Sequence, residues 1–273
     1  MTDHVWTGEK KRRAISSDDL KMRLDINKRS QSKDFQAWLR KRLNVQPSEQ
    51  ILDVGCGTGA QTYFMAEDAG EDGNVIAMDI SAESIENLKN NIPLHLKNRV
   101  SAHVLDMGNI EGFLNEKYNS KYYTLAQSSY ALYYSPKRIS VLTEMQKRTK
   151  NIGRVAIFTP CPPHGMISFV EKYHKISDPV QDSLYFGENI LRPLFRKSFH
   201  ELQVHYFQST ISIKTLEEFK LFYEASTYYN ESNNEGLYEE ATNIINRENV
   251  LKFDKCGILL IGSGVKNLCN EVF

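Results

Sequence analysis

The stretch most able to do chemistry is a loop with glycine at every second position, made of Gly55, Gly57 and Gly59. Without a Cβ atom, glycine takes positive φ and lets a ligand lie against bare backbone. Four strand-forming residues, 51–54, precede this loop, and residues 60–68 read as a helix whose N-terminus points back at it. Asp53 puts a carboxylate at the end of the strand. That charge favours a ligand with positive charge over one that presents only phosphates.

Carboxylates also end the next two predicted strands, at Asp79 and Asp106, and Gln127 with Ser128 ends the fourth. A doubly wound sheet binds ligands outside the carboxyl ends of its strands, so these side chains are expected to line one crevice. Buried carboxylates without partners are costly, and such a cluster calls for cations or hydrogen-bond donors. A ribose would offer hydroxyls to Asp79, an adenine amino group would donate to Asp106, and an α-amino group would approach Asp53.

The elements that must position these residues alternate between strand and helix, which predicts an α/β fold with a doubly wound, Rossmann-like parallel sheet. Expected strands cover residues 51–54, 74–79, 100–105, 122–127, 153–158, 202–213 and 252–261. Expected helices cover 59–69, 82–91, 109–117, 137–150, 166–176, 215–229 and 236–247. Before the first strand, two short helices within 18–43 are interrupted near Gln31 and Ser32. The proline-rich stretch 159–165 reads as a turn and 177–199 as irregular.

Charge and composition narrow the function classes. With 34 basic and 34 acidic residues, the chain has no overall field to recruit nucleic acid or an anionic membrane. Basic residues concentrate before the sheet, in Lys10-Lys11-Arg12-Arg13 and Arg40-Lys41-Arg42. A solvated arm and an arm that contacts RNA both fit this pattern. The four cysteines form no C-x-x-C pair, so neither a zinc site nor a disulfide framework is expected.

The expected cellular location depends on two sequence features, a signal peptide and a membrane-spanning segment. The polar first residues do not read as a signal peptide, and no apolar run approaches the ~20 residues that span a bilayer. The expectation is therefore a cytoplasmic protein with no membrane partner, no metal, and an oligomeric state left open between monomer and homodimer.

Three matched stretches resemble the class I S-adenosylmethionine-dependent methyltransferases, of the small-molecule type related to ubiquinone and menaquinone biosynthesis. They are Leu52-Asp53-Val54-Gly55-Cys56-Gly57-Thr58-Gly59, Val75-Ile76-Ala77-Met78-Asp79-Ile80-Ser81 and Val104-Leu105-Asp106-Met107. The resemblance implies a seven-stranded sheet with the last strand antiparallel, S-adenosyl-L-methionine as methyl donor, and S-adenosyl-L-homocysteine as product. The cofactor-binding residues it implies are Asp53, Gly55, Cys56, Gly57, Gly59, Asp79, Ile80, Asp106, Met107, Gln127 and Ser128.

The glycine spacing alone also allows an NAD-dependent oxidoreductase, because Gly55, Gly57 and Ala60 fit the dinucleotide-binding pattern G-x-G-x-x-G/A. Asp53, where a pyrophosphate would be repelled, the third glycine and Asp106 favour methyl transfer instead.

The acceptor side is expected downstream of the fourth strand. Tyr130 and Tyr134 would lie beside the transferred methyl group, and His164 is the candidate general base. Residues 1–48 are expected to cover the cofactor, with Arg23 or Lys28 near its carboxylate, and 49–273 to form the methyltransferase domain. Insertions at 177–199 and 214–249 would form the substrate side.

Three functional interpretations remain: a small-molecule O-, N- or C-methyltransferase acting by in-line displacement, an RNA or protein methyltransferase, and a fold member that binds cofactor without catalysis. After the fourth strand, Gln127-Ser128-Ser129-Tyr130 stands where amino-modifying enzymes carry N/D-P-P-Y/F. This departure and the neutral net charge disfavour nucleic acid. A large lid before the final strand favours a small, enclosed acceptor.

Overall fold

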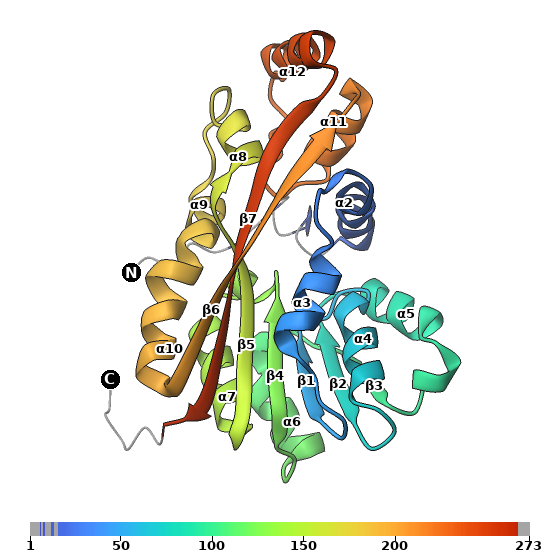
Figure 1. The fold of residues 1–273 in the computed structure, drawn as a ribbon, viewed down its shortest axis with the longest axis vertical. Coiled ribbons are helices and arrows are strands. Elements are labelled where there is room, and N and C mark those ends of the chain that lie inside the picture. Colours follow the sequence, from blue (N-terminus) through green and yellow to red (C-terminus); the bar gives the residue numbers. More distant parts are fainter. Residues whose placement is uncertain (1–5, 7, 9–11, 14–15, 267–273) are drawn as a thin grey trace.

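A seven-stranded mixed sheet organises the computed structural model, which describes residues 6, 8, 12–13 and 16–266 (Figure 1). The strand order is β3-β2-β1-β4-β5-β7-β6, and β7 runs antiparallel to both of its neighbours. The strands are β1 Gln50–Val54, β2 Asn74–Asp79, β3 Val100–Val104, β4 Tyr123–Ser129, β5 Thr149–His164, β6 Phe199–Ile213 and β7 Leu251–Val265. The predicted fold class is confirmed, including the antiparallel last strand.

Alternate residues of the buried strands enter two cores on opposite faces of the sheet. Ile51 and Val75 join one core, while their neighbours Leu52 and Ile76 join the other. This is the period-two pattern of a strand that is covered on both faces. The first core takes side chains from α3 Phe35–Leu43, α4 Ala60–Asp68 and α5 Ala82–Asn91. The second core takes side chains from α6 Ile110–Tyr118, α7 Arg138–Lys147, α9 Asp178–Tyr185 and α10 Arg192–Ser198.

The two predicted N-terminal helices are α2 Ser17–Ser30 and α3 Phe35–Leu43. Each begins at a side-chain cap, Ser16 for α2 and Asp34 for α3. Between them the backbone leaves helical geometry to contact β6, where the amide of Ser32 donates to the carbonyl of Thr210 at 2.9 Å. The predicted interruption near Gln31 and Ser32 is therefore a strand contact.

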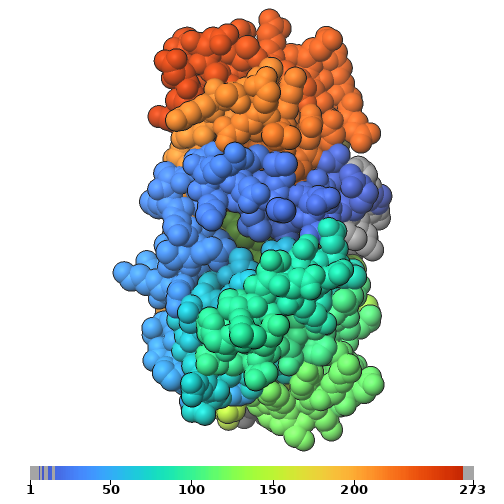
Figure 2. All heavy atoms as spheres, turned by 90° about the vertical axis from the view of Figure 1, so that its right-hand side faces the viewer, coloured from blue at the N-terminus to red at the C-terminus, as the bar shows by residue number. Residues whose placement is uncertain are grey.

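The strands β6 and β7 extend together beyond the rest of the sheet as a two-stranded ribbon (Figure 1). Three helices, α8 Gly165–Val170, α11 Leu216–Glu224 and α12 Glu235–Glu248, gather around its far end. We call these three helices, with residues 225–234, the lid. In Figure 2 the N-terminal helices form a blue band between the orange part of the lid, α11 and α12, and the sheet domain in cyan and green, with a hollow below the band.

Two expectations about irregular structure were wrong. Residues 159–165 do not turn, because β5 continues through the prolines to His164. Beyond the pair Ser129 and Phe158, β7 is the only strand among the described residues that pairs with β5. Prolines are tolerated along such a free edge because no ladder hydrogen bond is lost there.

Residues 177–199 are also regular, forming α9, a π-helical turn Phe186–Leu191 and α10. Pro179 and Pro193 are compatible with these helices, since both lie in the first turn of a helix, where proline is favoured.

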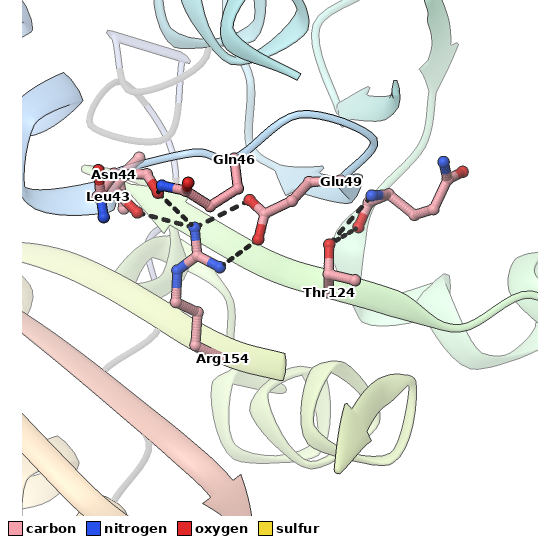
Figure 3. Close-up of polar contacts among 7 residues, drawn as sticks. Leu43, Asn44, Gln46, Glu49, Thr124 and Arg154 are labelled. Carbon is pink, nitrogen blue, oxygen red and sulfur yellow. Dashed lines mark hydrogen bonds and ion pairs between the residues drawn. The ribbon is translucent and has the colours of Figure 1, made fainter. Parts of the chain in front are cut away.

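A buried ion pair fixes the opposite end of the sheet from the glycine loop (Figure 3). Arg154 of β5 donates to both carboxylate oxygens of Glu49, at 2.6 and 2.9 Å, and to the carbonyl of Leu43 at 2.8 Å. The end of α3, the start of β1 and β5 are thereby joined through one guanidinium.

Some expectations concern residues outside this description, among them Lys10 and Lys11. Within residues 6, 8, 12–13 and 16–266, no helix has the length and hydrophobicity required to cross a membrane. The same residues hold no group of three or more histidine, cysteine or carboxylate side chains arranged for a metal ion.

Candidate active site

All three loop glycines adopt left-handed backbone angles, with φ of 78° at Gly55, 53° at Gly57 and 90° at Gly59. The amide of Gly55 donates to the carbonyl of Met78 at 2.8 Å, which fixes the loop to the end of β2. A Cβ at Gly55 would lie 2.2 Å from Cβ of Ala131. At Gly57 the nearest atom to an added Cβ is the Leu20 side chain of α2, 3.1 Å away. Gly55 therefore allows close packing, while Gly57 opens toward α2.

Asp79 lies directly beside the loop. Its carboxylate accepts the amide of Gly57 at 2.8 Å and the amide of Ser81 at 2.9 Å. Burial raises the pKa of Asp79, and the backbone hydrogen bonds oppose that shift. The next side chain, Ile80, is 40% exposed and offers an apolar surface at the end of β2.

Asp53 is completely buried behind the loop. Thr62 of α4 donates to one carboxylate oxygen at 2.6 Å, and the Gln127 amide of β4 donates to the other. Burial raises the pKa of Asp53 to about 7 against these hydrogen bonds. In this arrangement Asp53 ties β1 to α4 and β4, and its contact with a ligand amino group stays a prediction.

Two smaller side chains lie close to this network. Ser128, next to Gln127 on β4, has a buried hydroxyl for which the described residues supply no partner. The Cys56 thiol is buried, and burial together with Asp53 and Asp79 raises its pKa. A thiol in such surroundings stays protonated, so it serves as a packing group of the loop.

The end of β3 reaches the same region. Asp106 is exposed and accepts the amide of Gly108 at 2.8 Å. The methyl group of Met107 would lie 3.5 Å from a Cβ at Gly55. The structure thus brings the ends of the first four strands together, as the fold requires.

The aromatic residues after β4 form a second wall. Tyr130 has φ of 55°, and its amide donates to the carbonyl of Phe158 at 3.0 Å. The hydroxyl of Tyr130 is buried, with no hydrogen-bond partner among the described residues. Tyr134 stacks edge-on against Trp6, with ring centroids 4.7 Å apart. Both predicted tyrosines are near one another, and Tyr130 is next in sequence to the Ala131 that contacts the loop.

His164 caps the helix α8. Its Nδ1 accepts the amide of Ile167 at 3.4 Å, and its ring lies 5.9 Å from that of Tyr228. Burial, and then the charge of Lys255, lower the pKa of His164 to about 4. A neutral imidazole with Nδ1 as acceptor carries its proton on Nε2. His164 in this state offers a hydrogen-bond donor to the interior, and its role as a base stays a prediction.

Sequence reasoning missed Lys255 and Tyr228. Lys255 pairs with His164 across β5 and β7, and its Nζ lies 5.5 Å from the centroid of the Tyr130 ring. The alternation of apolar and polar residues along β7 could have identified Lys255, because Leu251 and Phe253 are buried while Lys252 and Asp254 are exposed. Period two places Lys255 on the inward face.

The sequence from residue 46 to 208 matches the family model described as a methyltransferase domain. A magnesium-protoporphyrin O-methyltransferase of Rhodobacter capsulatus is 34% identical over 41% of this chain and 45% of its own length. A demethylmenaquinone methyltransferase of Geobacillus sp. (strain WCH70) is 29% identical over 58% of this chain and 60% of its own length. The matches thus span about half to three fifths of these relatives.

Solved structures share the fold at low identity. A Bacillus halodurans C-125 protein superposes with a TM-score of 0.55 and 16% identity, covering 83% of this chain and 97% of its own. The plantazolicin methyltransferase BpumL, solved with SAH, gives a TM-score of 0.50 and 15% identity, covering 93% and 95%. With the family match over more than half of the sequence and the glycine loop in place, the chain belongs to the class I S-adenosylmethionine-dependent methyltransferase family.

Proposed function

We propose that this protein transfers a methyl group from S-adenosylmethionine to an oxygen, nitrogen or carbon atom of a small molecule. The observation that carries the proposal is the juxtaposition of a loop left bare at Gly57 with the carboxylate of Asp79. The two relatives are named for small-molecule methyl acceptors, which supports the same substrate class.

The residues present fit the cofactor. Gly57 leaves its backbone bare, and the only side chain of the described residues within 4 Å of the position of an added Cβ is that of Leu20, 3.1 Å away, which a bound ligand would displace. Asp79 has lone pairs left after its backbone hydrogen bonds to receive ribose hydroxyls. Ile80 and Met107 supply apolar side chains for a flat base.

When bound, S-adenosylmethionine supplies an activated methyl group on a positively charged sulfur. The chain's own task is to bind and orient the acceptor and to keep water out. We assign these tasks to the aromatic wall at Tyr130 and Tyr134, to residues 1–48, and to the substrate-side segments 177–199 and 214–249. Leu20 over Gly57, and the hydrogen bond from Asn87 to Ser17 at 3.1 Å, support the covering role of α2.

The basic clusters do not favour an RNA substrate, because several of their described members contact the protein itself. Arg13 donates to the carbonyl of Glu224 and lies 4.5 Å from the Tyr229 ring. Arg40 pairs with Asp68 through Nε at 2.9 Å. Arg42 lies 5.9 Å from the ring of Trp38.

Calorimetric titration with S-adenosylhomocysteine tests the proposal. Gly57→Val is expected to abolish binding while circular dichroism shows a folded protein. Gly70→Val is the matched control, since Gly70 shares a left-handed φ of 68° but has no atom near an added Cβ. Failure of the wild type to bind, or normal binding by Gly57→Val, would contradict the proposed function.

A further inference from the structure

Two cationic side chains face the interior between the glycine loop and the lid. Lys255 comes from β7 and Arg23 from α2. Arg23 donates through Nη1 to the carbonyl of Ala225 at 2.9 Å. Within the described residues, neither side chain forms an ion pair with a carboxylate, and Nζ of Lys255 has no hydrogen-bond acceptor.

The groups that surround these cations are neutral. His164 faces Lys255 from β5, Tyr130 from the end of β4, and Tyr228 lies against His164 from the lid. Desolvation, and then the nearby charge of Arg23, lower the pKa of Lys255 to about 8. Burial raises the pKa of Tyr130 and of Tyr228, so both hydroxyls stay protonated.

Both cations lie close to residues that pack against the glycine loop. Ala131 packs against Gly55. Tyr130 precedes Ala131 in the sequence, and Nζ of Lys255 lies over the ring of Tyr130. Leu20 of α2 covers Gly57, and Arg23 follows on the same helix face, because residues three apart are neighbours on a helix. Anything held between Lys255 and Arg23 is therefore next to the place assigned to the methyl donor.

We propose that Lys255 and Arg23 recognise an oxyanion, such as a carboxylate, on the methyl acceptor. This inference rests on the proposed function. Lys255 and Arg23 are half-buried, so both charges are partly removed from water, and no carboxylate of the described residues supplies a partner for them. An acceptor oxyanion would supply that partner, with Nζ and the free N–H groups of Arg23 as donors.

The test compares acids with their neutral amides on the full chain saturated with S-adenosylhomocysteine. The probes are acetate and acetamide, benzoate and benzamide, and 4-hydroxybenzoate and 4-hydroxybenzamide, titrated by calorimetry. At least one acid is expected to bind about tenfold more tightly than its amide, the usual size of a hydrogen bond to a charged group. Lys255→Met and Lys255→Gln should both remove that preference. Lys252→Met, an exposed lysine of the same strand, should keep it.

Each outcome decides between the two proposals. If S-adenosylhomocysteine binds but no acid is preferred, or if the preference survives in both Lys255 variants, the anion site is overturned and the proposed function stands. If the Lys255 variants lose S-adenosylhomocysteine instead, the cations serve the cofactor's carboxylate, and the inference about the acceptor is wrong. If the wild type does not bind S-adenosylhomocysteine, the proposed function itself fails.

Discussion

Arg154 lies near the start of β5, whereas Lys255 of β7 lies beside the end of β5, and both side chains are half-buried. Arg154 has a carboxylate, Glu49, and a backbone carbonyl within hydrogen-bond distance (Figure 3). Lys255 has an aromatic face, a neutral histidine and another cation. The first arrangement completes the hydrogen bonds of a cation and stabilises the fold. The second leaves a cation without an anion, which is the arrangement expected of a binding site.

The largest effect is expected from Arg154→Met, which leaves Glu49 buried without its partner. We predict a loss of about 2 to 4 kcal/mol in the free energy of unfolding, which is below the ~3 to 5 kcal/mol for a fully buried pair because the Arg154 side chain is 19% exposed. Urea denaturation measures it. The double variant Arg154→Met with Glu49→Leu should recover most of the loss, and a single variant as stable as the wild type would show that the pair contributes nothing.

Asp53→Asn tests a third buried charge, one that has hydrogen bonds but no cation. The folded-state pKa of about 7 lies above the ordinary value of 3.8. Between these values the folded protein holds a proton that the unfolded chain has released, so wild-type stability falls as pH rises through this window. We predict that Asp53→Asn flattens this slope and is the more stable protein above about pH 7 by about 1 to 3 kcal/mol. Thermal melts from about pH 5 to 8 measure the difference, and parallel curves would refute it.

Lys255→Met, like Arg154→Met, replaces a cation by methionine, but unlike Arg154→Met it should not destabilise the protein. At neutral pH we predict a melting temperature equal to that of the wild type or a few degrees higher, with about 2 to 4 °C corresponding to 1 kcal/mol. The pKa of Lys255 falls from 10.5 to about 8 on folding. Between these values the unfolded chain holds the extra proton, so wild-type stability rises with pH relative to the variant. Melts at about pH 7 and 9.5 should show the gap closing, and a variant less stable at both would contradict the account.

His164→Asn should have the smallest effect, because asparagine also accepts the amide of Ile167 at a helix N-cap. We predict a change below about 1 kcal/mol at neutral pH. The folded-state pKa of about 4 lies below the ordinary 6.5, so wild-type stability falls as pH drops through that window and the variant lacks this loss. Proton NMR of the imidazole should show it neutral at about pH 6, and a titration near 6.5 would be the contrary result.

The sheet could be predicted because each of its central strands carries a short apolar run between turn residues. The glycine loop and the acidic residues at the strand ends followed from the same pattern, since parallel strands all point their carboxyl ends to one edge. The prolines of β5 predict a turn that the structure does not contain, because the effect of a proline on a strand depends on its neighbours. At a free strand edge or in the first turn of a helix, proline replaces no hydrogen bond.

The acceptor side was harder because its residues come from distant segments. Lys255 and Arg23 are far apart in sequence, and only the ribbon of β6 and β7 with α2 brings them together. The role of His164 depended on a contact that no sequence pattern reveals, the amide of Ile167. The alternation of apolar and polar residues in β7 could have placed Lys255 on the inward face. It could not have shown that no carboxylate of the described residues pairs with Lys255.

Proton uptake on anion binding tests the central claim most directly. The protein, saturated with S-adenosylhomocysteine, is titrated at about pH 8.5 with the acid that it prefers most strongly over its amide, in two buffers of different ionisation enthalpy. There Lys255 is partly deprotonated, and a bound anion would raise its pKa. The account predicts that the wild type takes up a fraction of a proton per acid bound and that Lys255→Met takes up none. Binding with no uptake by the wild type, or equal uptake by both proteins, would contradict it.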